Sequence, residues 1–240
     1  MSKTKHIFTV VILSLLGVAL LVNFDKLPGQ FEYANSIYYH ITHNGVSETG
    51  SLNYVTAILY DYRAYDSLGE STIIFGAVSG IVLLLSRKTL PVSSHGLSFI
   101  VKRTFGMLTP FIFLFGIYII AHGHLSPGGG FQGGVILGAI SIIFSIVYGS
   151  EFDYKRYSPT TKTLLETSGA LLFIGLGLLG IIMGGNFLVN LKVLDSGVGT
   201  LLSGGIIPFI NIGIGFKIGA GLAIIFYSMI QKTFKEEGNL

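Results

Sequence analysis

Six long apolar runs constrain the fold of this chain more than any other feature of its sequence. Each run is close to the ~20 residues that an α-helix needs to cross the hydrocarbon core of a bilayer. Half of the 240 residues are hydrophobic and only 11% are charged, which is typical of polytopic membrane proteins. The sequence therefore predicts an all-α, polytopic transmembrane protein with about six spans. The predicted spans are 7–24, 69–86, 105–122, 132–149, 164–187 and 206–231.

A glycine-rich break, HGHLSPGGGFQGG over residues 122–134, separates the third and fourth predicted spans. Its proline and glycines exclude a continuous helix. Lipid cannot hydrogen-bond to free backbone groups, so the break must lie at a water interface or against protein. We expect the glycines to provide positive φ angles or close approach, and the polar side chains to satisfy the turn. The residues assigned to this structural loop are Ser126, Pro127, Gly128, Gly129, Gly130 and Gln132.

The distribution of basic residues predicts the topology. Loop 87–103 is the most basic segment, because Arg87, Lys88, Lys102 and Arg103 lie in it, and such loops face the cytoplasm. Both termini are then cytoplasmic, and the protein is expected in the cytoplasmic membrane. The run 7–24 resembles a signal peptide, but an uncleaved first membrane helix fits it better.

Two segments outside the spans bear on the domain organisation. Residues 52–65 show helical periodicity but are too few to cross a bilayer, so we expect a half-helix or interfacial helix leading into the second span. Loop 25–51 is polar and suggests no chemistry. A change of composition at 90–98 predicts two parts, a two-span part over 1–90 and a four-span part over 91–240.

Composition also excludes several functions. The chain has no cysteine, which excludes disulfides, iron–sulfur ligation and c-type haem attachment. The net charge of +3 is small, and the basic residues lie at helix ends, so no nucleic-acid partner is expected. No catalytic triad, phosphate-binding loop or dinucleotide fingerprint occurs. We expect no cofactor in this chain and no catalysis by it alone, while membership of an ion-translocating oxidoreductase complex stays open.

Lys217 is the strongest candidate for an ion path. It lies near the middle of the sixth predicted span with Gly213, Gly215, Gly219 and Gly221 around it. A lysine at this depth costs about 2.5–3.5 kcal/mol on insertion scales. One interpretation is a charge coupled to a proton or cation path. The other is a lysine bound to carbonyls or to a carboxylate of a neighbouring subunit, and the glycines then allow close helix packing.

Asp61, Asp66 and Glu70 form an acidic cluster near the second span. Carboxylates suit Na⁺ coordination or a proton relay. A structural interpretation is also available, with Ser67 as N-cap and Glu70 closing a capping box. Arg63 can pair with Asp61 or Asp66. Asp61 has no capping role, which favours a functional role for it.

His122 and His124 titrate in the physiological range, so a proton-relay role is open to them. The alternative is that each ring hydrogen-bonds to carbonyls of the glycine loop. Their i, i+2 spacing is poor for shared metal ligation, and no metal site is expected. Glu166 is interpreted as structural at the start of the fifth span. The side chains interpreted as interhelical hydrogen-bonding groups are Asn186, Asn190 and Asn211.

Two stretches resemble known proteins of one kind. The run Arg103–Leu137 (RTFGMLTPFIFLFGIYIIAHGHLSPGGGFQGGVIL) resembles the MnhB/MrpB family of the Mrp-type multisubunit Na⁺/H⁺ antiporters, and a looser likeness continues to about residue 230. The run Leu59–Glu70 (LYDYRAYDSLGE) is similar to a D-F-R-x-x-D-T-L-G-E element near the C-terminal end of the MrpA protein of these antiporters. That element also forms a small separate protein in membrane-bound hydrogenases. Tyr62 and Ser67 replace its usual Phe and Thr.

The resemblance implies a membrane component of a sodium/proton translocation module, similar to a fusion of two small membrane proteins of a membrane-bound hydrogenase, those of the E and F types. This fusion favours a respiratory complex in which the partners are antiporter subunits and hydrogenase-like or iron–sulfur subunits. A role within a standalone Mrp antiporter and a purely structural bridging role stay open. An independent channel or carrier is disfavoured, because the spans contain one lysine and few acidic groups.

Overall fold

A computed structural model of the chain describes residues 31–85, 96–191 and 197–237 and scattered positions between 11 and 22. The chain divides into two compact units, residues 1–43 and 44–240. The described residues are mostly helical and contain no strand. The elements are α2 (Phe31–Thr49), α3 (Tyr54–Ala57), a π-helical turn η1 (Ile58–Tyr62), α4 (Ala64–Leu85), α5 (Phe99–Ala121), α6 (Gly130–Val147), α7 (Ser150–Arg156), α8 (Pro159–Gly184) and α9 (Ile207–Glu237).

Five of the described helices are long and apolar enough to cross a membrane: Ala64–Leu85, Phe99–Ala121, Gly130–Val147, Pro159–Gly184 and Ile207–Ile230. They confirm the prediction of an all-α, polytopic membrane protein. They correspond to five of the six predicted spans, and the remaining span, 7–24, lies largely outside the described residues. Helices α4, α5 and α8 begin more than one turn earlier than predicted, because charged or polar residues interrupt the apolar pattern near their starts.

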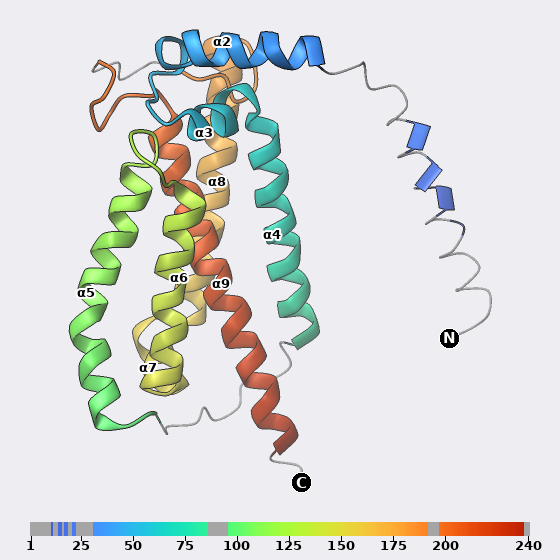
Figure 1. Cartoon of the computed structure of the whole chain (residues 1–240). Coiled ribbons are helices and arrows are strands. Elements are labelled where there is room, and N and C mark those ends of the chain that lie inside the picture. Colours follow the sequence, from blue (N-terminus) through green and yellow to red (C-terminus); the bar gives the residue numbers. More distant parts are fainter. Residues whose placement is uncertain are drawn as a thin grey trace. The chain divides into compact units, whose positions relative to one another are not determined.

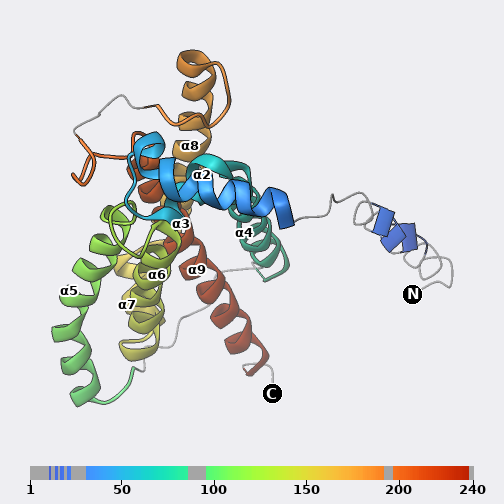
Figure 2. The same ribbon diagram turned by 45° about the horizontal axis from the view of Figure 1, so that its top comes forward.

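Within the unit 44–240, helix α9 is central. It packs against α4, α5, α6 and α8, and it lies between α6 and α4 in both ribbon views (Figures 1 and 2). Glycines make these contacts close. A Cβ atom on Gly134 of α6 would lie 2.9 Å from the Gly215 carbonyl oxygen of α9. On the other side of α9, Gly169 of α8 lies against the backbone of Gly213. Small residues at interfaces let membrane helices approach in this way.

Two loops predicted from the sequence contain helices. Segment 25–51 was expected to be irregular, yet α2 covers Phe31–Thr49, and residues 25–30 lie outside the described part. The helix was missed because its residues are polar and lack a clear apolar stripe. The segment 150–163, which connects the fourth and fifth predicted spans, contains the short helix α7. The predicted domain boundary near residue 90 stays a prediction.

The short helix expected over 52–65 is present, but it is interrupted. Asn53 caps α3 by accepting hydrogen bonds from the amides of Val55 and Thr56. The chain continues as η1 and bends at Arg63 (φ −130°, ψ 38°) before α4 begins. The predicted capping box of Ser67 and Glu70 is wrong, because Ser67 lies inside α4. Its hydroxyl donates instead to the Leu59 carbonyl at 2.7 Å, which accepts this bond within the π-helical turn.

Candidate functional site

Lys217 forms an ion pair inside the helical bundle. Its Nζ lies 3.3 Å from Oε1 of Glu166 on α8, and only 3% and 5% of the two side chains are exposed. The ammonium also lies 4.8 Å from the centre of the Phe75 ring of α4. Removing one member of a buried pair costs about 3–5 kcal/mol. The partner of Lys217 is thus a carboxylate of this chain, whereas the structural alternative from the sequence was a carbonyl or a carboxylate of a neighbouring subunit.

Close backbone packing brings this pair together. A Cβ atom on Gly169 would lie 2.3 Å from the Gly213 carbonyl oxygen and 2.8 Å from the Lys217 amide nitrogen. Any larger residue at position 169 would separate α8 from α9. The glycines next to Lys217 therefore serve helix packing, as the sequence predicted, and they also set the distance to Glu166.

A second buried ion pair, which the sequence did not suggest, joins α7 to α8. The Lys162 ammonium contacts the Asp153 carboxylate, and 5% and 1% of their side chains are exposed. Ser141 of α6 donates a hydrogen bond to Asp153 at 2.8 Å. Lys162 Nζ also lies 5.1 Å from the ring centre of Tyr227 on α9. Asp153 and Lys162 lie in the segment 150–163, where acidic and basic residues nearly balance. Nothing in that sequence pattern indicates that two of these charges are buried.

The glycine-rich loop has the backbone that the sequence predicted. Gly128 and Gly129 have φ angles of 151° and 144°. A Cβ atom on Gly130 would lie 2.4 Å from the Asn211 carbonyl oxygen of α9. Ser126 donates to the His122 carbonyl at 3.3 Å. Pro127 and Gln132 are exposed.

Side chains from residues 51–56 satisfy the carbonyls of this loop. Asn53 donates from Nδ2 to the carbonyls of Gly123 (2.8 Å) and Ser126 (2.9 Å). Thr56 donates to the Gly123 carbonyl at 2.7 Å, and Ser51 donates to the His124 carbonyl at 2.8 Å. These contacts span more than 60 residues of sequence, so no local pattern could have revealed them.

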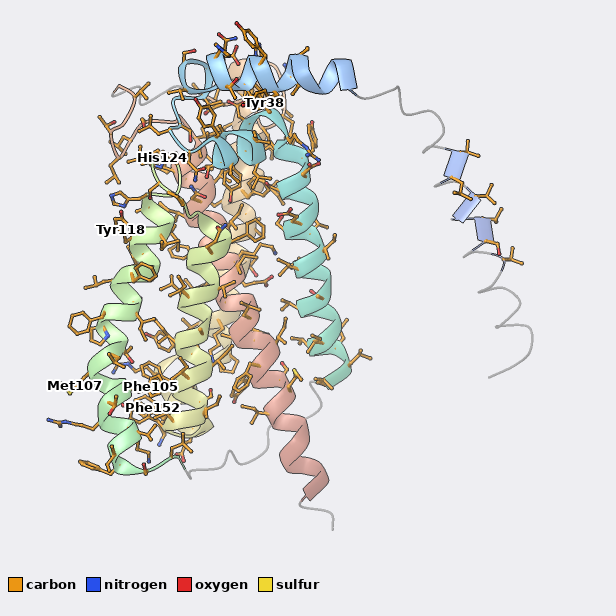
Figure 3. All side chains as sticks on the ribbon, viewed as in Figure 1. Tyr38, Phe105, Met107, Tyr118, His124 and Phe152 are labelled. Atoms are coloured by element: carbon orange, nitrogen blue, oxygen red, sulfur yellow. The ribbon has the colours of Figure 1, made fainter. Side chains whose placement is uncertain are left out.

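The two histidines have different environments. His124 is fully buried at the loop that follows α5 (Figure 3). Its Nε2 lies 3.3 Å from the Thr200 carbonyl, which only accepts hydrogen bonds, so Nε2 carries the proton and Nδ1 has a lone pair. Burial is the largest effect on the pKa of His124 and lowers it. The His122 ring stacks on Tyr118, with centroids 4.2 Å apart.

The expectation that both rings bind carbonyls of the glycine loop is therefore wrong. His122 Nδ1 faces the Tyr118 carbonyl of its own helix, and His124 reaches the segment before α9. Near His124, three polar atoms are buried without a hydrogen-bond partner in the described part of the chain: His124 Nδ1, Ser203 Oγ and Asn211 Nδ2.

The three acidic candidates near α4 have unlike surroundings. Asp61 accepts a hydrogen bond from Asn190 Nδ2 at 3.2 Å. Asp66 pairs with Arg63 at 2.5 Å on the surface. Glu70 is exposed, and its charge adds to burial in raising the pKa of Tyr60. Their roles in an ion path stay predictions.

Among the residues with described positions, no three His, Cys, Asp or Glu side chains form a group able to hold a metal ion.

The fold and the site define a polytopic helical membrane protein whose central helix carries a buried ion pair. The model of a family described as a domain related to the MnhB subunit of Na⁺/H⁺ antiporters matches residues 100–224. The chain belongs to this family, which confirms the resemblance seen in the run Arg103–Leu137.

Known proteins similar to the chain include a relative of nearly the same length and chains of two membrane complexes. The uncharacterized protein MJ1307 of Methanocaldococcus jannaschii is 31% identical, over 88% of this chain and 95% of the relative. A chain of the membrane-bound sulfane sulfur reductase, described as an archaeal respiratory membrane complex, is 30% identical with a TM-score of 0.71, over 95% of this chain and 99% of the other. A chain of the Mrp complex from Dietzia sp. DQ12-45-1b shares the fold, with 23% identity and a TM-score of 0.59, over 96% of this chain and 26% of the other.

Proposed function

We propose that this chain is a non-catalytic membrane subunit of a multisubunit Na⁺/proton antiporter module and that it contributes Lys217 and Glu166 to the ion path. The buried pair on α8 and α9 carries this proposal. Membership of the MnhB-related family supports it. The pair consists of two ionisable side chains inside membrane-spanning helices. Such residues are rare there and usually functional.

A respiratory membrane complex is the assembly we favour for this module. The likeness to a chain of the sulfane sulfur reductase covers almost the full length of both chains, which supports this context over a standalone antiporter. In such an assembly the neighbouring membrane subunits belong to the antiporter module, and hydrogenase-like or iron–sulfur subunits carry the electrons. This chain itself holds no cofactor in our proposal.

The charges at the helix ends support an orientation in the cytoplasmic membrane. Lys102 and Arg103 lie in the first turns of α5, and the positive-inside rule favours the cytoplasm for this end. The connection from α6 through α7 to α8 then lies at the cytoplasmic end as well, and the glycine-rich loop lies at the opposite end. Both termini are cytoplasmic in this arrangement.

The ion pair supplies a proton-binding group whose charge is balanced inside the bundle. Lys217 lies ten residues into α9, or about 15 Å along the helix axis from Ile207. Glu166 neutralises the lysine in a medium of low dielectric constant, where a change of charge at a neighbouring site acts strongly on the pair. A proton or sodium ion moving through an adjoining subunit therefore acts directly on the charges of this pair.

Transport by vesicles containing the intact complex tests this proposal. Lys217→Ala should abolish Na⁺-dependent proton movement, measured per assembled complex because the loss of one member of a buried pair also lowers stability. Lys155→Ala, which removes an exposed lysine of α7, is the control and should transport normally. Unchanged transport by Lys217→Ala would refute the proposal.

A double variant separates function from stability. In Glu166→Leu/Lys217→Leu both charges are replaced by apolar side chains, a change that proteins often tolerate. We expect this variant to assemble and to be inactive. Assembly with normal transport would show that the pair only holds α8 and α9 together.

A further inference from the structure

The two buried ion pairs belong to one series of charges. Asp153, Lys162, Glu166 and Lys217 alternate in sign along α7, α8 and α9, and the four side chains are 1–5% exposed. We infer that they form a proton-transfer line between the α7 end of the bundle and Lys217. This inference rests on the proposed role of Lys217 and adds Asp153 and Lys162 to the path.

The geometry of α8 connects the two pairs. Lys162 lies in the first turn of this helix, and Glu166 follows four residues later, about 6 Å deeper along the axis. Residues at i and i+4 lie on the same face of a helix and within reach of each other. Lys162 contacts Asp153 on one side, and Glu166 contacts Lys217 on the other. Every member of the line thus has an oppositely charged neighbour.

The surroundings favour transfer along the line over loss of the proton to the side. Lys162 lies near the Tyr227 ring and Lys217 near the Phe75 ring. A cavity of about 170 Å³ between α5, α6, α8 and α9 is lined largely by apolar side chains and also by Ser141, Tyr157 and Lys162. These three polar groups and this volume can hold water, which gives the line an exchange point at its Lys162 end.

The transfer requires no other reactant. In the first step an N–H bond of Lys162 breaks and an O–H bond forms on Asp153, which leaves a neutral amine and a neutral carboxylic acid. In the second step Lys217 gives a proton to Glu166 in the same way. In the third step the Glu166 acid turns towards Lys162 and protonates its amine. One proton has then moved from Lys217 to Asp153. The Ser141 hydroxyl, which is hydrogen-bonded to Asp153 and lines the cavity, relays it from Asp153 to water there, while the path beyond Lys217 restores the lysine.

A lysine-to-arginine substitution distinguishes this line from a structural network. Lys162→Arg keeps the positive charge and the ion pair with Asp153, but a guanidinium does not give up its proton in proteins. We expect Lys162→Arg to assemble normally and to lose Na⁺-dependent proton flux in vesicles by about 100-fold or more, the effect typical of removing a positioned proton-transfer group. Normal flux in Lys162→Arg would overturn the inference.

Matched variants in the same region complete the test. Asp153→Asn removes a proton-accepting group of the line and should also lose flux, measured per assembled complex. The control is Glu151→Gln/Lys155→Gln, which removes an exposed ion pair of the same helix α7 and should leave flux unchanged. Flux in Asp153→Asn at the level of this control would contradict the line.

The outcomes separate this inference from the proposed function. If Lys217→Ala is inactive while Lys162→Arg and Asp153→Asn are active, Lys217 keeps its role and the line to α7 is refuted. If all three variants are active, both proposals fall. If all three are inactive and assembled, the line is supported.

Discussion

The side-chain oxygen of Asn211 on α9 accepts a hydrogen bond from the backbone amide of Gly130, the first residue of α6, at 2.9 Å. The first amides of a helix have no partner within the helix, and Gly129 before it has no side chain to cap them. Asn211 is fully buried, so one side chain of the central helix replaces the missing cap at the glycine-rich loop.

Replacing Asn211 by leucine should therefore destabilise the protein. The substitution leaves the Gly130 amide buried without an acceptor, which costs about 1–3 kcal/mol. Thermal unfolding of the purified complex in detergent measures the effect. Asn186→Leu, at an exposed position after α8, is the control, and equal unfolding temperatures for the two variants would contradict the capping role.

The close approach of α6 to α9 leads to a second prediction, for Gly130→Ala. Its Cβ would lie 2.4 Å from the Asn211 carbonyl oxygen, so the two helices must move apart, and we expect poor assembly of the complex. Gly175→Ala on α8 is the matched control, because nothing lies within 4 Å of its Cβ position. Native gel electrophoresis compares the two, and normal assembly of Gly130→Ala would show that this contact is not required.

Local sequence patterns were enough to predict five of the six spans and the position of Lys217 inside one of them. Apolar length reports membrane crossing directly, and a charge inside such a run is visible without a structure. The partner of the charge is not visible, because Glu166 is 51 positions away and the pairing depends on which helices pack together. For the same reason the sequence assigned Glu166 a structural role at a water boundary.

The second ion pair was missed for a different reason. In the sequence Asp153 lies beside the charged residues Glu151 and Lys155, a pattern typical of a solvated loop. Its burial depends on contacts with Ser141 of α6 and Lys162 of α8. The positive φ angles of the glycine-rich loop were predictable, because glycine has a direct effect on the backbone. The side chains of residues 51–56 that bind this loop were not, since long-range contacts leave no periodic signal.

A third prediction concerns the dependence of stability on pH. Because burial lowers the pKa of His124 in the folded state, the fold disfavours the protonated ring. The stabilisation is full above the unfolded-state pKa of about 6.5 and is lost as the pH falls below that value. Wild-type protein should therefore lose more thermal stability between pH 7.5 and 5.5 than His124→Gln does. The difference should correspond to the uptake of at most one proton on unfolding.

Glutamine is a suitable replacement because its amide nitrogen can donate to the Thr200 carbonyl without titrating in this range. His122→Gln serves as the control for the neighbouring ring, and it should lose more thermal stability over this pH range than His124→Gln does. Identical pH profiles for the wild type and His124→Gln would show that the buried ring does not determine acid sensitivity.

A fourth prediction concerns Asp61 and its partner Asn190. Nδ2 of Asn190 donates to the Thr49 carbonyl and to Asp61 Oδ2, both at 3.2 Å, and its Oδ1 accepts from the Ile206 amide at 3.1 Å. Asn190 thus joins the segment before α9 to residues on both sides of α3. Asn190→Leu removes all three bonds, so we expect faster hydrogen exchange at the Ile206 amide and a lower unfolding temperature.

Asp61→Asn should have a much smaller effect, because an asparagine oxygen can accept the same hydrogen bond from Asn190. We expect this variant to assemble as the wild type does, whereas Asp61→Leu, which removes this one bond, should lower the unfolding temperature by less than Asn190→Leu does. The charge of Asp61 matters only if ions or protons pass this carboxylate. An assembled Asp61→Asn complex without Na⁺-dependent proton flux would therefore place Asp61 in the ion path, the role that its sequence position favours.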